Sequence, residues 1–255
     1  MKKRISNGIG LILFSSCILL LTQVVQADIF IKQKRHSDAM KIMGQEQPAE
    51  DVIEEVWVTD EGFRSDNPKN SIIVKLDDKT ITMIDHEKKS YSEMPMDMNK
   101  MMPQTEAGKK DAEDMAAFQN MMKNMMKIDI SVQPMSDTKK IKNWMCKKYL
   151  MTMNTFMGAF TSEIWATEDL KMDADLYSKF ASSMMAAIPG MQSSLEAMTT
   201  EMKKIKGVQV QTIMTQNIMN QEHKIITELL EFKEGKAPSD LFKLPAGYKK
   251  QNVMK

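Results

Sequence analysis

Cysteine is almost absent from this chain, which has two among 255 residues. Cys17 lies in an apolar N-terminal stretch, so the remainder contains Cys146 alone and can form no internal disulfide. A lone thiol in an oxidising compartment is buried, paired with another chain or reactive, and burial suits a side chain that behaves as a small hydrophobe. Lys147 and Lys148 beside it would lower its pKa, but the sequence shows no positioned base.

Glycine and histidine are also scarce, with ten and three residues. The chain has no GxSxG elbow, no phosphate-binding glycine loop and no HExxH pair, because His36, His86 and His223 are scattered. A pairing of Cys146 with His223 is the catalytic arrangement that remains, and it lacks a recognisable nucleophile context. We therefore predict a protein that is not an enzyme and carries no cofactor.

No apolar run is long enough to span a membrane comfortably. The longest, Ile9 to Leu21, has thirteen residues, follows the basic start MKKR and precedes VVQA, where Val25 and Ala27 flank one residue. This pattern predicts a signal peptide over residues 1–27, cleaved after Ala27, and a periplasmic protein without a stable membrane anchor. Two alternatives remain open: a lipoprotein box with Cys17 lipidated, and an uncleaved signal anchor.

Neither sign of charge dominates. Removing residues 1–27 leaves 32 basic and 34 acidic residues, a net charge near −2. Such a balance argues against nucleic acid or an anionic membrane as the main partner. Residues 28–255 are long enough for one substantial core and contain no convincing low-complexity linker, so we predict a single domain. The sequence does not indicate its oligomeric state.

Strand signals dominate what is present. DIFIKQK alternates apolar and polar residues, and EEVWVTDEGFRSD indicates two strands around a turn at residues 60–62. In SIIVKLDDKTITMID, the alternation of Ile72, Val74, Ile81 and Met83 predicts a hairpin with one buried face. Further strands are expected in IDISVQPM, KNWMCKKYLMTM, AFTSEIWATED, GVQVQTIMTQ and HKIITELLEFKEG.

Methionine is abundant, with 28 residues, and much of it follows helical spacing. We expect a methionine-rich helical insertion at about residues 95–127, with a loop up to Gly108 and then an amphipathic helix. Further helices are expected over residues 173–188 and from Met191 to Gly207. The fold class is therefore predicted as α+β: a curved antiparallel sheet with amphipathic helices packed on its concave side.

Five ordered landmarks carry a resemblance. EEVWVTDEGFRSD, DDKTITMIDHEKKSYSEM, IKNWMCKKY, SEIWATEDL and FKLPAGYKK together resemble a family of bacterial periplasmic proteins that is a domain of unknown function, related in fold to the LolA/LolB lipoprotein carriers. The resemblance covers residues 52–250 and implies a half-open barrel with an apolar cavity. The insertion at 95–127 and the helices of 173–206 exceed the plug expected of a minimal carrier, which argues against lipoproteins as the specific cargo.

The resulting hypothesis is a non-catalytic periplasmic protein that binds a hydrophobic small molecule, a lipid, an acyl chain or lipoprotein-like cargo. Methionine suits such a cavity because it is flexible and fits varied apolar guests. The predicted lining residues are Trp57, Met83, Phe118, Met122, Met126, Trp165, Phe180, Met184 and Met198. Ordinary core packing is the alternative for each of them, and a structural or interaction module without ligand is the alternative for the protein.

A methionine cluster in MPMDMNKMM supports a different hypothesis. The thioether is a soft ligand that suits Cu(I), and alternate methionines of an extended chain point to one side. The candidate ligands are Met94, Met96, Met98, Met101 and Met102. If exposed, the same residues would scavenge oxidants through reversible sulfoxide formation.

Overall fold

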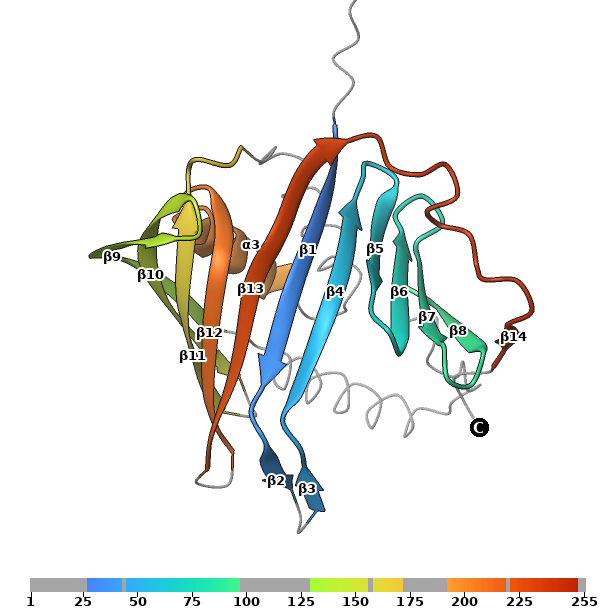
Figure 1. Cartoon of the computed structure of the whole chain (residues 1–255), viewed down its shortest axis with the longest axis horizontal. Coiled ribbons are helices and arrows are strands. Elements are labelled where there is room, and N and C mark those ends of the chain that lie inside the picture. Colours follow the sequence, from blue (N-terminus) through green and yellow to red (C-terminus); the bar gives the residue numbers. More distant parts are fainter. Residues whose placement is uncertain are drawn as a thin grey trace, which may run out of the picture.

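One large antiparallel sheet dominates the computed structural model, which describes residues 27–42, 45–96, 129–155, 158–171, 192–218 and 221–251 (Figure 1). A short separate hairpin, β2 (Met40–Ile42) and β3 (Gln45–Gln47), leaves its lower end. The strands of the sheet are β1 (Asp28–Ser37), β4 (Glu50–Val58), β5 (Gly62–Asp66), β6 (Asn70–Lys75), β7 (Thr80–Asp85), β8 (Ser90–Pro95), β9 (Asp129–Ile141), β10 (Trp144–Thr155), β11 (Gly158–Thr167), β12 (Val208–Ile218), β13 (Gln221–Gly235) and β14 (Lys249–Lys250).

The sheet consists of two meanders joined by β1. Its order is β14-β8-β7-β6-β5-β4-β1-β13-β12-β11-β10-β9, and β14 joins β8 in parallel. Sequence neighbours therefore pair within each half, while β1 pairs with β4 on one side and β13 on the other. The outer strands β9 and β14 do not pair with each other, so the sheet is open. The prediction of a large antiparallel sheet is confirmed.

The expected strand boundaries follow local turn chemistry. The turn at residues 60–62 is the link between β4 and β5, where the Thr59 hydroxyl accepts hydrogen bonds from the backbone N–H groups of Glu61 and Gly62, both at 3.1 Å. The turns after β6 and β7 contain Lys79 (φ 51°) and Lys89 (φ 49°), both in the left-handed region. Both tight turns hold β6, β7 and β8 in register.

The two faces of the sheet differ in chemistry. Ile29 and Ile31 of β1 pair with Val58 and Val56 of β4, and we call their side the apolar face. Side chains at the intervening positions form the charged face, where Lys32 pairs with Glu55 at 2.7 Å. Directly paired residues of an antiparallel sheet lie on the same side, so the register between strands extends both faces across the neighbouring strands.

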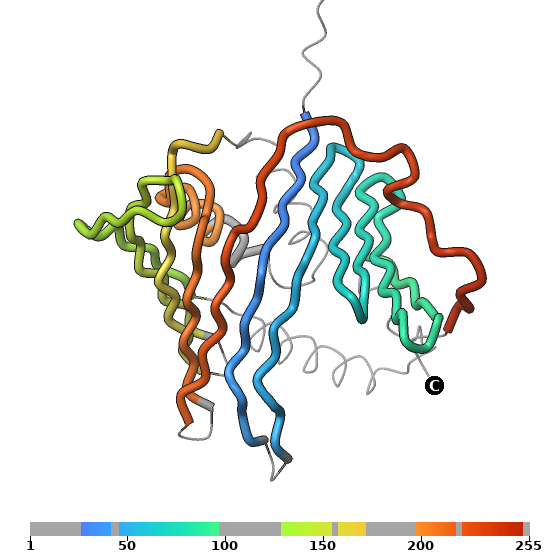
Figure 2. Tube along the Cα trace, in the orientation of Figure 1, coloured from blue at the N-terminus to red at the C-terminus, as the bar shows by residue number. Residues whose placement is uncertain are grey.

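The C-terminal segment 236–248 runs across β5–β8, where Figures 1 and 2 show it passing in front of the strands. We call it the strap. Its Leu241 is buried, at 8% exposed. On the charged face of β6 and β7, under the strap, Ser71, Ile73, Thr82 and Ile84 are buried, in contrast to the exposed charges elsewhere on that face.

The strap overturns one detail of the predicted hairpin. Ile72 and Met83, expected on its buried side, are 40% and 46% exposed. Ile73 is 2% exposed and lies on the opposite side of β6. Alternation identifies two sides of a strand but cannot say which one a distant segment covers.

The predicted cover of helices on the concave side is not supported. In the part of the chain that the structure describes, α3 (Gln192–Met202) is the single helix, and it contacts β9 at one end of the sheet. Glu201 accepts a hydrogen bond from the Val132 backbone N–H at 2.6 Å, which satisfies a donor of this edge strand. The helices expected within 95–127 and over 173–188, and the signal peptide up to residue 26, lie outside the described residues. The described fold is thus mostly β, with very little helix.

The described residues contain no helix long and apolar enough to cross a membrane.

Candidate functional site

The apolar face continues from the centre of the sheet into β10–β13. The register aligns Met151, Ser162, Met214 and Ile225 in one cross-strand row, and this row meets β1 at Ser37. The Met151, Met214 and Ile225 side chains are half-buried. Apolar side chains from β10, β12 and β13 thus remain partly accessible in this row, on either side of the buried Ser162 of β11.

A parallel row lies two residues along the strands. It aligns Met153, Phe160, Gln216 and His223, so two more half-buried apolar side chains join the same face. His223 is buried, and its ring nitrogens lie 2.9 Å from Gln216 Nε2 and 3.1 Å from the Ser37 hydroxyl. The row therefore ends at a buried histidine whose two ring nitrogens both have hydrogen-bond partners.

The apolar face also reaches the other half of the sheet. Val56 of β4 pairs with Ser65, which pairs with Ile72, and Ile72 pairs with Met83. Ile72 and Met83 are therefore an exposed apolar pair on the same side as Val56. Of the predicted lining residues, Met83 is one that the structure does place on the apolar face.

The predicted Trp57 lies on the other side. Trp57 pairs with Phe30, with ring centroids 5.0 Å apart, and alternation places both opposite to Val56 and Val58. Half-buried Trp57 belongs to the charged face because it stands between two core valines that point the other way. The sequence pattern VWV is apolar on both sides, so alternation could not assign it.

Trp165 is buried in a core cluster with Cys146, Val208, Val210 and Leu229, against which Ile31 packs, and charged groups border its indole. It pairs with Lys148, whose ammonium lies 5.8 Å from the indole centroid and 2.9 Å from Glu163. The Lys139 ammonium lies 4.0 Å from the centroid, close enough for a cation–π interaction. The indole Nε1 is the one buried side-chain polar atom without a hydrogen-bond partner in the described part of the chain. Trp165 is thus a core residue whose indole two lysines border.

Of the other predicted lining residues, the structure describes only Met198. Met198 is half-buried in α3. Phe118, Met122, Met126, Phe180 and Met184 lie outside the described residues. The structure therefore places Met83 on the apolar face, Trp57 on the opposite face and Trp165 in a buried core cluster, and the predicted lining stays a prediction.

The methionine cluster falls within the described residues only at its start. Met94 is half-buried at the end of β8, and Met96 is 6% exposed, with its backbone N–H bonded to the Lys79 carbonyl at 2.8 Å. Met98, Met101 and Met102 lie outside the described residues, so copper binding stays a prediction. Among described residues, no group of three His, Cys, Asp or Glu side chains is arranged to hold a metal ion.

Cys146 is 1% exposed and packs against Trp165, Val208, Val210 and Leu229. This burial raises the pKa of its thiol, which opposes formation of the nucleophilic thiolate. His223 belongs to the row of Met153, seven residues further along β10, a distance of roughly 23 Å. The structure therefore does not bring Cys146 and His223 together.

A polar network that the sequence analysis missed fastens the strap. Arg64 holds Asp66 through Nε and Nη2 at 2.7 to 3.0 Å, and its Nη1 donates to the Leu241 carbonyl at 2.6 Å and the Lys243 carbonyl at 3.2 Å. At the other end of the strap, Tyr248 OH lies 2.9 Å from His86 Nδ1. Arg64, His86 and Tyr248 lie within three of the landmark segments of the resemblance, in GFRSD, MIDHEKKSY and PAGYKK. The ordered presence of these segments was therefore the sequence signal that could have identified the network.

Ser71 connects the two ends of this network. Its hydroxyl donates to Asp66 at 2.5 Å and lies 2.8 Å from His86 Nε2. Because its one hydrogen points to Asp66, Ser71 accepts from Nε2–H, and Nδ1 then accepts from the hydroxyl of Tyr248. This arrangement leaves His86 unable to take a proton from Ser71 and makes the network a structural clasp.

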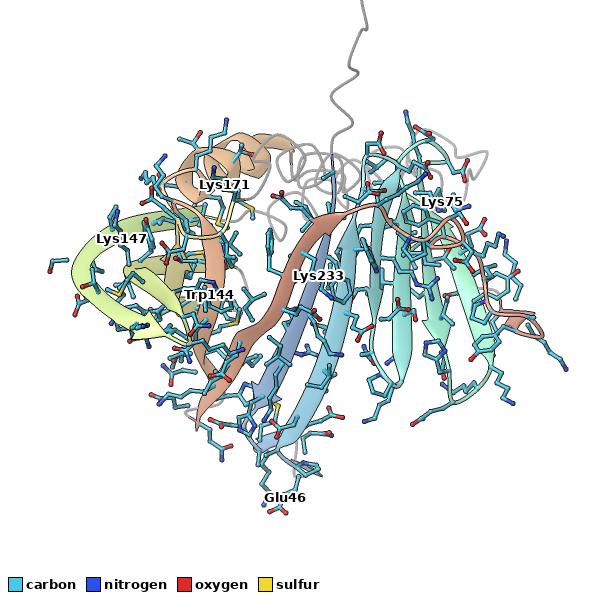
Figure 3. All side chains as sticks on the ribbon, turned by 45° about the horizontal axis from the view of Figure 1, so that its top comes forward. Glu46, Lys75, Trp144, Lys147, Lys171 and Lys233 are labelled. Atoms are coloured by element: carbon cyan, nitrogen blue, oxygen red, sulfur yellow. The ribbon has the colours of Figure 1, made fainter. Side chains whose placement is uncertain are left out.

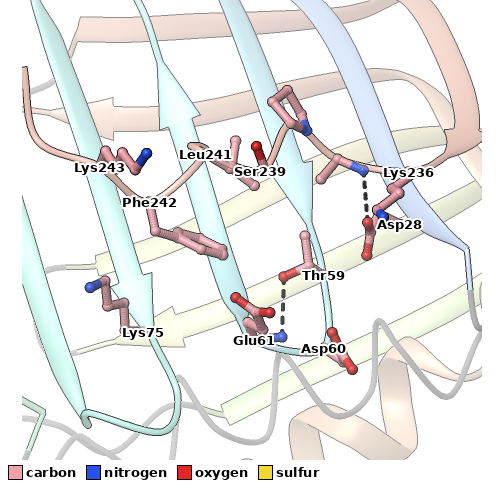
Figure 4. Close-up of a pocket in the computed structure, with 12 residues that line it drawn as sticks. Asp28, Thr59, Asp60, Glu61, Lys75, Lys236, Ser239, Leu241, Phe242 and Lys243 are labelled. Atoms are coloured by element: carbon pink, nitrogen blue, oxygen red, sulfur yellow. Dashed lines mark hydrogen bonds between the residues drawn. The ribbon is translucent and has the colours of Figure 1, made fainter.

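A hollow of about 420 Å³ lies where the strap begins, beside the β4–β5 turn (Figure 4). Asp28 accepts a hydrogen bond from the Ala237 backbone N–H at 2.8 Å at one end. Side chains of both signs line the hollow, among them Asp60, Glu61 and Lys75. Such a lining does not suit an apolar ligand.

Charged side chains otherwise extend along the whole sheet, from Lys147 at one end through Lys233 on β13 to Lys75 at the other (Figure 3). On the charged face, Lys233 forms an ion pair with Glu231 at 2.5 Å. Exposed pairs of this kind contribute little to stability but keep their face hydrated. The charged and apolar faces are therefore distinct in chemistry.

Comparison with known proteins agrees with the resemblance at the level of the family. No curated protein matches the chain. The family DUF4412, described as a domain of unknown function, matches residues 58–248, from the end of β4 to the last residue of the strap. This match spans most of the chain, which therefore belongs to the DUF4412 family.

Proposed function

We propose that this protein binds a hydrophobic molecule without changing it chemically, on the apolar face of a half-open barrel of the LolA/LolB type. One observation carries the proposal: accessible apolar side chains, several of them methionine, lie on the apolar face of β6, β7 and β10–β13, whereas most ion pairs between strand residues lie on the opposite face. Apolar surface left partly accessible gains free energy when a ligand covers it, by about 25 cal/mol per Å². A contiguous accessible apolar surface commonly marks a binding site.

The composition of this face supports a ligand of variable shape. Met83, Met151, Met153 and Met214 all lie on it. Methionine has three rotatable bonds and a polarisable sulfur, so its side chain adjusts to differently shaped apolar guests. We infer an acyl chain or similar lipid moiety as the bound portion.

The proposal is non-catalytic because the best candidate groups are already engaged. Ser71 is 1% exposed and donates to Asp66, and Cys146 is 1% exposed with a raised pKa. Neither provides an accessible, activated nucleophile. Secretion into a bacterial periplasm through a signal peptide ending at Ala27 belongs to the same proposal, because a carrier of lipids between membranes acts there.

A matched pair of variants tests the proposed surface. Ile72 is 40% exposed on the apolar face, and Ile53 is 38% exposed on the charged face, where it pairs with Lys34. We expect Ile72→Asp, combined with Met83→Asp, to weaken binding of the neutral probe N-phenyl-1-naphthylamine at least tenfold. Ile53→Asp should leave it unchanged within about twofold, because aspartate there joins an already charged surface.

The measurement is probe fluorescence titrated against residues 28–255, with circular dichroism and urea midpoints verifying the fold of each variant. Native mass spectrometry of the protein isolated without detergent should show an apolar adduct. Absence of saturable probe binding would overturn the proposal. Equal losses in both kinds of variant would move the binding surface away from the apolar face.

A further inference from the structure

An arginine interrupts the apolar face. Arg35 aligns with Thr227, Thr212, Ile164 and Tyr149 in a third cross-strand row, on the same side as the two methionine rows. Its side chain is 44% exposed. In these three rows it is the one permanently cationic side chain, whereas the lysines of β1 point to the charged face.

The guanidinium of Arg35 has donors to spare. Its nearest carboxylate is Glu54, at 3.9 Å from Nη2, which is an ionic contact but too long for a hydrogen bond. Glu54 in turn accepts a hydrogen bond from Gln33 Nε2 at 2.8 Å. No hydrogen bond links Arg35 to another side chain in the part of the chain that the structure describes.

Arg64 and Arg35 differ in how their guanidinium donors are used. Beyond residue 27 the sequence contains two arginines and otherwise uses lysine as its cation. Arg64 directs its nitrogens to Asp66 and to two carbonyls of the strap, so its geometry is used structurally. Arg35 has the same planar fork of donors, which matches a carboxylate in bidentate fashion, without such partners.

The position of Arg35 beside the methionine rows suits an amphiphilic ligand, with one charged group and one apolar tail. The adjoining row runs from Ser37, next to Arg35 on this face, through Ile225 and Met214 to Met151. It crosses from β1 to β10, four strand spacings or roughly 19 Å. A ligand held by Arg35 could lay a long apolar tail along this row.

We propose that the ligand is a long-chain fatty acid, with its carboxylate on Arg35 and its tail across Ile225, Met214 and Met151. This inference rests on the proposed function and names its ligand class. A single negative charge suits the site better than a phosphate monoester, which carries about −1.5 to −2, because Arg35 is the one permanent cation of these rows and the carboxylates of Glu54 and Glu50, the latter paired with Lys69, both act on it.

The test compares ligands that share one tail: oleate, oleyl alcohol and oleoyl lysophosphatidate, each displacing N-phenyl-1-naphthylamine from residues 28–255. Wild type should bind oleate at least tenfold more tightly than the alcohol. Arg35→Gln should reduce this ratio to about one while leaving alcohol binding unchanged, and Arg35→Lys should retain part of it. Lys34→Gln, one residue away on the charged face, is the matched control and should keep the full ratio.

Each alternative outcome is decisive. Equal binding of oleate and the alcohol by wild type overturns the fatty-acid assignment but leaves the proposed function standing. A preference that survives Arg35→Gln excludes Arg35 as the headgroup contact. Tighter binding of lysophosphatidate than oleate refutes the carboxylate in favour of a phosphate. If none of the three ligands displaces the probe, the fatty-acid inference fails, and if the probe itself does not bind, the proposed function fails with it.

Discussion

Replacing Gly207 by alanine should destabilise the protein strongly. Gly207 links the end of the α3 region to β12 and adopts φ +84°, a left-handed conformation that disfavours any side chain. An added Cβ would stand 1.9 Å from the Thr167 carbonyl oxygen, 2.5 Å from its carbon and 2.9 Å from the Glu168 nitrogen. All three atoms belong to the backbone of the β11 end, so no side-chain rotation relieves the overlap.

The magnitude follows from two contributions. The left-handed conformation costs about 1–2 kcal/mol for an L-residue, and forcing atoms into an occupied site typically costs about 1–3 kcal/mol. We therefore expect the free energy of unfolding to fall by roughly 2–5 kcal/mol, a large part of the stability of an ordinary domain. The backbone of β11 or β12 must shift to accommodate the methyl group.

Two other glycines separate these contributions. Gly247 has nearly the same φ, +82°, but an alanine methyl group there would meet no atom within 4 Å, so Gly247→Ala should show the conformational cost alone. Gly235 has neither a positive φ nor a close neighbour, and Gly235→Ala should be neutral or slightly stabilising.

Urea unfolding monitored by tryptophan fluorescence gives the free energy of each variant by linear extrapolation. The expected order of destabilisation is Gly207→Ala well above Gly247→Ala, and Gly247→Ala above Gly235→Ala. If Gly207→Ala loses no more stability than Gly247→Ala, the close approach of Gly207 to Thr167 does not contribute and the reasoning is refuted.

Three further predictions concern buried or paired groups. Cys146 should react with a thiol reagent only at the rate of unfolding, because it is buried and its pKa is raised; rapid stoichiometric labelling of the native protein would contradict this. Tyr248→Phe should lower stability by about 1 kcal/mol and speed proteolysis of the strap, since it deletes the bond to His86; unchanged proteolysis would argue against the clasp. The pKa of Glu201 is lowered from 4.5, chiefly by the hydrogen bond from Lys204 and then by that from the Val132 backbone N–H. The stabilisation that Glu201 provides is therefore complete above pH 4.5 and is lost as the pH falls through its folded-state pKa. Glu201→Gln should flatten the curve of unfolding free energy against pH below 4.5, and an unaltered slope would refute this.

Local periodicity predicted the strands because period-two alternation needs only neighbouring residues. The β1, β6 and β7 segments and the turn at 60–62 were recognisable this way. The same reasoning misassigned Ile72 and Met83, because both sides of β6 carry apolar residues and the strap covers the side of Ile73. The side of Trp57 could not be assigned for the same reason, because a valine precedes it and a valine follows it in the sequence.

The sequence suggested the chemical character of the candidate site but not which residues come together in it. Methionine abundance suggested an adaptable apolar surface, which stays a prediction, and the register places the exposed Met83 on the apolar face. Ile225 and Arg35 are 190 residues apart in the chain and become neighbours only because β1 inserts between the two meanders. No local pattern contains that pairing.

By itself, the sequence determined most strands, the turns and membership of the family, because these depend on composition, periodicity and ordered motifs. Only the tertiary structure decided which side of each strand is apolar, because side assignment requires the register between strands. It also distinguished the two arginines: Arg64 fastens the strap, whereas Arg35 faces the methionine rows. Their difference arises from alternation within the sheet and from the path of the C-terminal segment, which long-range pairing alone defines.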